Sequence, residues 1–279
     1  MKFLFWNIND NYINKKMPWI NQIIDDENPD IFCVAEGPKS IKKCSEFISH
    51  IQNKGYNTYY SPTLYNTNIV CNQYGWNSFG LKVFIKTSIS NINNFTFSEQ
   101  QLDGRIIYLR FQVNGIFYST FLIHGMSKVG DVINQNSFII ELSRYISTKT
   151  LQNNQDRIII MGDFNIEPWE KELMQNARYI NSFFYYKSFN FNSNKFLNRI
   201  YFNPVLEYIQ KNSNLNLIGT FYNMQNIGIL DFPLISKEVT NFDFKIITEI
   251  GGVSLIFLKK KKCILKHNFD HLPITLKIK

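Results

Sequence analysis

Short continuous apolar runs alternate with helical apolar stripes along the first quarter of the chain. The runs at residues 2–8 and 31–35 have the length and continuity of buried strands. Pro18 suits the start of a helix between them, and Pro38 is expected to open a second helix that ends near Asn53. The pattern therefore predicts a β-α-β-α beginning, with apolar helix faces at Trp19, Ile20, Ile23, Ile24 and at Ile41, Cys44, Phe47, Ile48, Ile51.

The rest of the chain is dominated by strand patterns. Asn114-Gly115, between two apolar runs, is the strongest hairpin signal in the sequence. Helices are expected at 132–147 and 204–211, with a short one starting at Pro168-Trp169. Strands are expected at 80–85, 105–112, 116–123, 157–161, 218–222, 229–235, 252–258, 263–265 and 274–278.

The strands fall into two sheet-rich halves, before and after about residue 150. Two mixed sheets packed face to face, with helices outside, would account for this pattern in an α/β protein. Blocks of polar residues that follow apolar runs lie at both ends and in the middle of the chain. One site built from them would need the whole sequence, so residues 1–279 are expected to form a single domain.

The most informative of these blocks is Gly162-Asp163-Phe164-Asn165, which follows the apolar run at 157–161. A buried strand in this position would bring a carboxylate and an amide to the edge of a sheet. Trp6-Asn7, Ala35-Glu36 and Asp270-His271 could bring matching groups to the same edge. A carboxylate, a carboxamide and a histidine at strand ends are suited to metal-assisted cleavage of a phosphate ester.

In this order, the four blocks resemble the endonuclease/exonuclease/phosphatase superfamily, which includes deoxyribonuclease I-like nucleases, abasic-site endonucleases, neutral sphingomyelinases and inositol-phosphate phosphatases. The resemblance implies a four-layer α/β/β/α sandwich with two packed mixed sheets. It also implies a hydrolase of phosphate esters that depends on Mg²⁺, with Mn²⁺ as a possible substitute.

The resemblance also implies roles for individual side chains. Asp163 would orient or deprotonate the attacking water, and Asn165 would bind the scissile phosphate. His271 would be the general base or would stabilise the pentavalent phosphate. Asp231 would hold His271 in its working tautomer, with Asp243 as a competing candidate that lacks the matching context. The remaining catalytic candidates are His124, as a second imidazole, and Asn7, which would grip the pentavalent state.

Glu36 and Asp270 match the metal-binding positions of the family, with Asn7 or Asn9 as further ligands. Some members have an acidic residue where this chain has Asn9. A metal site that binds more weakly, or that holds a single ion, is therefore one alternative. Phe269 stands where the family commonly has Ser. Arg105 is a candidate for phosphate binding, with a surface arginine as the alternative.

The formal net charge of +8 and the pI near 9.1 favour a polyanionic partner, and nucleic acid fits best, DNA before RNA. An AT-biased genome would also enrich Asn, Ile and Lys without any selection for binding. The lysines at 259–262, with Lys266 and His267, are expected to form a solvated turn or to contact a nucleic-acid backbone. The aromatic residues at 183–191 are expected in the core or stacked on bases.

Isolated cysteines, the absence of a signal-peptide pattern and the absence of an apolar run of membrane-spanning length favour a cytoplasmic protein without a membrane partner. Three functions remain open. The first is a Mg²⁺-dependent nuclease. The second is a phosphatase or phospholipase acting on inositol phosphates or sphingomyelin-like lipids. The third is a non-catalytic protein that only binds nucleic acid. The sequence does not indicate the oligomeric state.

Overall fold

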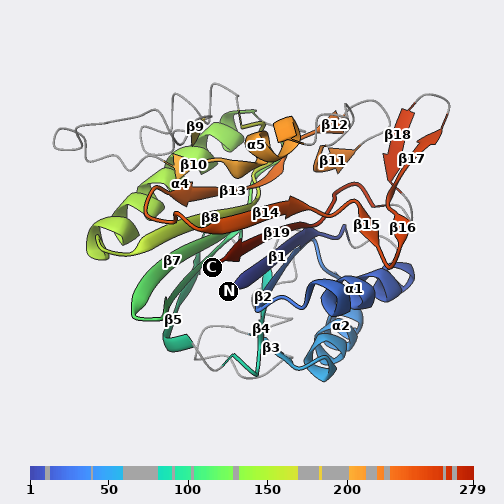
Figure 1. Cartoon of the computed structure of the whole chain (residues 1–279), viewed down its shortest axis with the longest axis horizontal. Coiled ribbons are helices and arrows are strands. Elements are labelled where there is room, and N and C mark those ends of the chain that lie inside the picture. Colours follow the sequence, from blue (N-terminus) through green and yellow to red (C-terminus); the bar gives the residue numbers. More distant parts are fainter. Residues whose placement is uncertain are drawn as a thin grey trace.

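Two mixed β-sheets lie face to face at the centre of the protein, with helices on both outer sides (Figure 1). The computed structural model describes residues 1–9, 13–38, 40–58, 81–89, 92–101, 104–127, 132–168, 182–183, 201–211, 219–222, 227–259, 262–265 and 269–279. The short strands outside the two sheets form three separate pairs: β11 (Phe221–Tyr222) with β12 (Ile227–Gly228), β15 (Glu249–Ile250) with β16 (Val253–Ser254), and β17 (Ile256–Lys259) with β18 (Lys262–Leu265).

The first sheet has the strand order β14-β19-β1-β2-β4-β3. Its members are β14 (Phe242–Ile246), β19 (Ile274–Ile278), β1 (Lys2–Asn7), β2 (Ile31–Ala35), β4 (Lys82–Lys86) and β3 (Tyr56–Thr58). Only β1 and β2 are parallel; the other neighbours are antiparallel. The first and last strands of the chain are therefore neighbours in the middle of one sheet.

The second sheet has the strand order β5-β6-β7-β8-β13-β10-β9. Its members are β5 (Ile92–Gln101), β6 (Ile106–Val113), β7 (Ile116–His124), β8 (Arg157–Asp163), β13 (Asp231–Ser236), β10 (Tyr201–Phe202) and β9 (Ser182–Phe183). Strands β7 and β8 run parallel, and β13 runs antiparallel to β8. The expected hairpin at Asn114-Gly115 joins β6 to β7, with both residues at positive φ.

Aromatic side chains fill the layers between the sheets and helices. Phe3 of β1 contacts Phe111 of β6 across the two sheets, with ring centroids 6.1 Å apart. Helix α2 (Ile41–Asn53) packs on β4, and helix α4 (Val132–Gln152) packs on β6 and β7 through Tyr145. The remaining helices are α1 (Ile13–Glu27) and α5 (Pro204–Lys211). Helices α1 and α2 lie on the opposite side of the sheets from α4, which confirms the α/β/β/α sandwich (Figure 1).

Helix α1 begins earlier than the sequence pattern predicts. The helix starts at Ile13, so Pro18 lies inside it instead of at its N-terminus. A proline in a helix interior normally loses a backbone hydrogen bond and shortens the helix. Here the turn before Pro18 is held to the protein by buried Ile13 and by Lys16, which donates hydrogen bonds to backbone carbonyls.

Helix α2 begins later than predicted. The chain enters the helix at Ile41, and Ser40 is the N-cap: its side chain accepts a hydrogen bond from the backbone N–H of Lys43. Serine is a favoured cap because its hydroxyl satisfies one of the orphan N–H groups at a helix start. Pro38 therefore lies before the helix.

Several expectations fall outside the described residues. These are the short helix from Trp169, the part of the aromatic stretch at 183–191 that follows Phe183, Lys260 and Lys261 in the lysine turn, and the following Lys266 and His267. The hairpin that this turn connects is present as β17 and β18.

The buried carboxylate of Asp156 is expected to be a stability determinant of the second sheet. It accepts hydrogen bonds from Nε and Nη2 of Arg110 at 2.7 and 3.1 Å and from the hydroxyl of Ser119 at 2.7 Å. Replacing Asp156 with Asn removes the charge and should lower the free energy of unfolding by about 2 kcal/mol, because a part-buried arginine loses its partner. Urea unfolding measures the change.

The matched control is Asp243→Asn, because Asp243 and Lys279 form an ion pair in which both side chains are about half exposed. This control should change the free energy of unfolding by less than about 1 kcal/mol. Equal effects of the two substitutions would contradict the assignment of a structural role to Asp156.

Candidate active site

The register of the second sheet places three polar side chains on neighbouring strands. His124 at the end of β7 pairs with Asp163 at the end of β8, and Asp163 pairs with Asp231 at the start of β13. Residues that pair directly across adjacent strands point to the same face of a sheet. The three side chains therefore form one row, and all three are buried, with exposed fractions of 1% or less.

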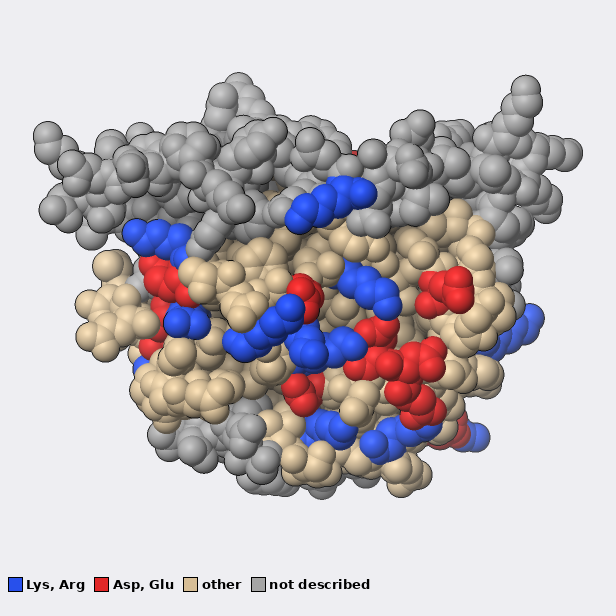
Figure 2. Space-filling model, in the orientation of Figure 1, with Lys and Arg blue, Asp and Glu red and all other residues tan. Residues whose placement is uncertain are grey.

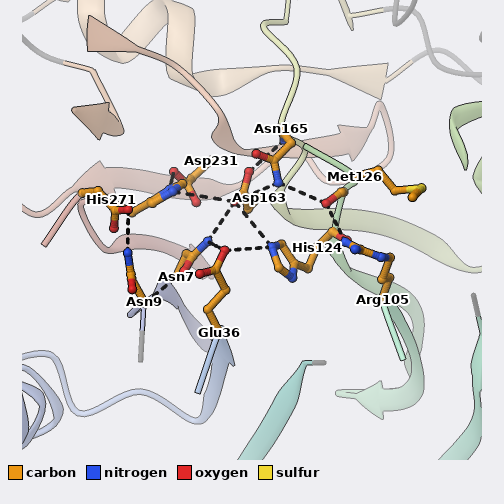
Figure 3. A network of polar contacts seen from close by, with 12 residues as sticks. Asn7, Asn9, Glu36, Arg105, His124, Met126, Asp163, Asn165, Asp231 and His271 are labelled. Atoms are coloured by element: carbon orange, nitrogen blue, oxygen red, sulfur yellow. Dashed lines mark hydrogen bonds and ion pairs between the residues drawn. The ribbon is translucent and has the colours of Figure 1, made fainter. Parts of the chain in front are cut away.

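The first sheet brings its own row to the same place. The parallel strands β1 and β2 end side by side, with Asn7 paired to Ala35, and Glu36 follows directly. Strand β19 runs antiparallel to β1, so Asp270 and His271, just before it, lie at the same edge. Figure 3 shows the two rows meeting at Asp163 of the second sheet.

Asp163 is the centre of the contacts in this site (Figure 3). Its Oδ2 accepts a hydrogen bond from Nδ2 of Asn7 at 3.0 Å and lies 3.9 Å from Nε2 of both His124 and His271. Its Oδ1 accepts the backbone N–H of Asn165 at 2.8 Å. One carboxylate therefore faces both imidazoles and two of the three asparagines that the sequence singles out, Asn7 and Asn165.

His271 and Asp231 form a buried pair, with Nδ1 and Oδ2 2.8 Å apart. Burial by itself lowers the pKa of His271, but the negative charges of Asp231 and Asp163 outweigh burial and hold that pKa above its usual value. Burial raises the pKa of Asp231, against the opposing effect of the imidazolium. With Nδ1 engaged by Asp231, Nε2 is the nitrogen that faces Asp163.

Two residues outside the four motifs, Thr220 and Phe221, support this pair. The hydroxyl oxygen of Thr220 accepts the backbone N–H groups of Leu230 and Asp231, each at 2.9 Å. The ring of Phe221 lies 4.8 Å from the imidazole of His271. An isolated antiparallel bridge between Phe221 and His271 brings this segment to the site.

Asn7 and Asn9 each donate a hydrogen bond to one of the carboxylates of Glu36 and Asp270. Nδ2 of Asn7 donates to Oε1 of Glu36 at 3.2 Å, and Nδ2 of Asn9 donates to Oδ2 of Asp270 at 2.9 Å. Burial opposes ionisation of Glu36, but hydrogen bonding and charge from His124, 3.4 Å from Oε1, help to hold its pKa below the usual value. Glu36 is therefore ionised at neutral pH.

These residues fit a hard divalent cation. Oδ1 of Asp270 is buried and has no hydrogen-bond partner in the described structure, an arrangement that is costly unless a cation or water satisfies it. Carboxylate and amide oxygens are the ligands that Mg²⁺ prefers. Asp163, Asp231 and His271 also place potential ligand atoms within 4.8 Å of one another. Because Nδ1 of His271 already contacts Asp231, that second group matches proton transfer better than metal binding.

Three site residues have left-handed backbone conformations: Asn9 at φ 43°, Glu36 at φ 51° and Asn165 at φ 53°. Non-glycine residues in this region cost free energy, and such residues concentrate at functional sites. Strands β7 and β8 also approach closely here. A Cβ on Gly125 or Gly162 would lie 2.2 or 2.0 Å from a backbone oxygen of the neighbouring segment, so both positions require glycine.

Asn165 and Arg105 both contact the backbone of the His124-Gly125 segment. Nδ2 of Asn165 donates to the Gly125 carbonyl at 3.0 Å, and Gln135 of α4 donates to the Asn165 carbonyl at 2.8 Å. Gln135 carries no sequence signal, because only the fold brings α4 to this turn. Nη1 of Arg105 donates to the carbonyls of His124 and Gly125, so this nitrogen supports the backbone behind His124 (Figure 3).

Asp243 does not join the site. It lies on β14 and forms an ion pair with Lys279. Of the two aspartates that could have partnered His271, the structure brings Asp231 to it.

No protein-family model matches the sequence, and comparison with curated proteins finds no match. Solved structures do match over nearly the whole chain. Humanized D. rerio TDP2 superimposes with a TM-score of 0.59 at 10% identity, covering 99% of this chain and 98% of that one. The human Nocturnin catalytic domain matches with a TM-score of 0.57 at 15% identity, covering 100% and 94%. The 3'-5' exonuclease NExo from Neisseria meningitidis gives 0.55 at 15% identity, covering 100% and 99%.

These three are enzymes of the endonuclease/exonuclease/phosphatase superfamily. This chain has the endonuclease/exonuclease/phosphatase fold. The resemblance predicted from the motif order is thereby confirmed at the level of the fold. In the endonuclease/exonuclease/phosphatase fold of this chain, the four motif blocks and Asp231 meet at one edge of the paired sheets.

No helix in the described part of the chain has both the length and the apolar character needed to cross a membrane.

Asp231 is expected to be the main reason that the pKa of His271 is raised. Asp231→Asn removes a negative charge next to the imidazolium, so the pKa of His271 should fall by about one to three units. Histidine NMR titration of the metal-free protein measures this directly. Asp243→Asn is the control and should leave the His271 titration unchanged. A His271 pKa that stays the same in Asp231→Asn would show that the pair does not set the protonation of this ring.

Proposed function

We propose that this protein is a Mg²⁺-dependent phosphodiesterase, and specifically a nuclease that hydrolyses nucleic-acid phosphodiester bonds by attack of water. The observation that carries the proposal is the meeting of the His271–Asp231 pair with Asp163, beside the carboxylates of Glu36 and Asp270. A carboxylate that can accept a proton from water, next to a protonated imidazole and to oxygen ligands for a cation, is what hydrolysis of a phosphate diester requires.

The proposed mechanism assigns proton transfer to the centre of the site. Asp163 would orient the attacking water and accept its proton. His271, which Asp231 keeps protonated with Nε2 facing the reaction, would stabilise the pentavalent phosphate. Nδ2 of Asn165 and Nδ2 of Asn7 lie within 3.3 Å of Oδ2 of Asp163, where they could also donate to the oxygens of the pentavalent phosphate. His124 would protonate the leaving oxygen.

The metal-binding role belongs to the other half of the site. Glu36 and Asp270 would hold Mg²⁺, with the side-chain oxygen of Asn7 or Asn9 as a further ligand, and Mn²⁺ could take its place. A bound Mg²⁺ would neutralise charge on the phosphate and stabilise the leaving oxygen.

Nucleic acid is the proposed substrate, DNA before RNA. The net charge of +8 favours a polyanion. One matching structure is described as the 3' phosphatase NExo bound to a product DNA hairpin and another as an AP endonuclease from Archaeoglobus fulgidus. Charge alone does not locate the binding face: on the surface in Figure 2, Lys and Arg are interspersed with Asp and Glu. Several lysines of the described chain are in ion pairs, namely Lys2 and Lys245 with Glu27, Lys54 with Asp25, and Lys279 with Asp243.

We further propose that residues 1–279 act as one domain, since the site draws on strands from both ends of the chain. Cytoplasmic residence fits the free thiols of Cys33 and Cys44, because thiols persist in reducing compartments.

The direct test is cleavage of supercoiled plasmid, single-stranded DNA, RNA and bis-p-nitrophenyl phosphate, with Mg²⁺ or Mn²⁺ and with EDTA. We expect metal-dependent cleavage of nucleic acid that EDTA abolishes. Asp163→Asn keeps the size of the buried side chain but removes its charge, and should lower the rate by roughly a thousandfold. Asp243→Asn is the control for loss of a carboxylate and should cleave at the wild-type rate.

The other outcomes separate the competing functions. Hydrolysis of the diester dye without cleavage of any nucleic acid would redirect the search to inositol phosphates and sphingomyelin-like lipids. Binding of DNA without hydrolysis of any substrate, equally strong in Asp163→Asn, would indicate a non-catalytic binding protein.

A further inference from the structure

Lys16 is a lysine of helix α1 whose side chain is fully buried beside the site, with an exposed fraction of 0%. Its ammonium donates hydrogen bonds to the carbonyl oxygens of Ile8 and Asn9, at 2.7 and 2.5 Å. It also lies 5.1 Å from the centre of the Phe269 ring. Burying an ammonium group costs several kcal/mol unless its donors are satisfied. The two carbonyls and the aromatic ring therefore compensate the buried charge of Lys16. Packing of α1 alone would not require a charged side chain at this position.

The two carbonyls belong to the segment that follows β1. Asn9 has a left-handed backbone, at φ 43°, which is unfavourable for a non-glycine residue. In this conformation the carbonyls of Ile8 and Asn9 converge on one cation. The ammonium of Lys16 therefore stabilises the backbone turn that presents Asn9.

The same turn orients two side chains of the metal-binding half of the site. The backbone N–H of Asn9 donates to Oδ1 of Asn7 at 3.2 Å, so Nδ2 of Asn7 faces Glu36 and Asp163. Nδ2 of Asn9 donates to Oδ2 of Asp270, and Oδ1 of Asp270 has no hydrogen-bond partner among the described residues. The position of Asn9 thus influences both carboxylates proposed to hold the metal.

Phe269 connects Lys16 to the other side of the site. Its ring packs on the indole of Trp6, with centroids 4.7 Å apart. Nε1 of Trp6 donates to the carbonyl of His271 at 3.1 Å. Lys16 therefore contacts both the segment after β1, through Asn9, and the segment before β19, through Phe269. Asn9 and Asp270 in these two segments are 261 positions apart in the chain. Phe269, in place of the Ser common in the family, supplies the aromatic face for this contact.

We propose that Lys16 is a positioning residue that raises the affinity of the site for a divalent cation, acting through Asn9 and Phe269 on Asp270 and Asn7. This inference rests on the proposed metal-dependent function. Residues that orient metal ligands without touching the metal commonly change metal affinity by 10- to 100-fold, which sets the scale of the expected effect.

The test is Mn²⁺ binding measured by isothermal titration calorimetry, which requires no turnover. Lys16→Met keeps the length of the side chain but removes its charge and donors, and should raise the Kd for Mn²⁺ by about tenfold. Lys2→Met is the matched control. Lys2 also donates to a backbone carbonyl, that of Glu27 at 2.7 Å, but lies at the opposite end of β1 from Asn7, so its Kd should equal that of wild type.

A second variant tests the route of the effect. Asn9→Gly removes the side chain that contacts Asp270 and tolerates positive φ. Asn9→Gly should also raise the Kd for Mn²⁺. Lys16→Met should raise the Kd by a smaller factor in the Asn9→Gly background than in the wild-type protein, because the two substitutions act on the same contact with Asp270.

The outcomes are separable. Absence of Mn²⁺ binding by the wild-type protein would overturn the proposed metal site and this inference with it. Wild-type binding with an unchanged Kd in folded Lys16→Met would overturn the inference alone.

If Lys16→Met does not fold, the wild-type protein labelled with ¹³C at lysine Cε decides. Mg²⁺ should shift the Lys16 signal and leave the Lys2 signal in place, and an unshifted Lys16 signal would overturn the inference.

Discussion

Strand register at Asp163 is the constraint on which the rest of the site depends. Asp163 pairs with His124 on one neighbouring strand and with Asp231 on the other, so the three side chains share one face of the second sheet. A slip of one residue in either pairing would turn His124 or Asp231 to the opposite face. The close approach of β7 and β8 beside Asp163 is possible because Gly125 and Gly162 lack a Cβ.

The second requirement is that the two ends of the chain meet. Strand β19 pairs with β1, and the N-terminal ammonium donates to the carbonyl of Ile278 at 2.7 Å. This pairing brings Asp270 and His271 beside Asn7 and opposite Asp163. A site assembled in this way forms only when most of the fold is complete, because its parts come from β1, β2, β7, β8, β13 and the segment before β19.

The electrostatics of the site differ from those of the whole chain. The protein carries a formal charge of +8, whereas its centre gathers the carboxylates of Glu36, Asp163, Asp231 and Asp270. Carboxylates this close remain ionised only with compensating donors or cations. His271, His124 and the asparagine amides supply part of that compensation. The unpartnered Oδ1 of Asp270 shows that the described side chains leave part of it to a cation or water.

The sequence by itself determined the fold class and the row of motif residues, because buried strands ending in polar blocks have a strong local pattern: 157–161 before Gly162-Asp163 is the clearest example. It placed the start of α1 wrongly at Pro18, since the contacts of Ile13 and Lys16 that extend the helix are not local. The resemblance also favoured Asp231 over Asp243 as the partner of His271, and the structure has this contact. Only the tertiary structure decided that Lys16, Gln135 and Thr220 support the site. The physical reason is that these contacts join residues far apart in the chain, and pairing register and burial select them.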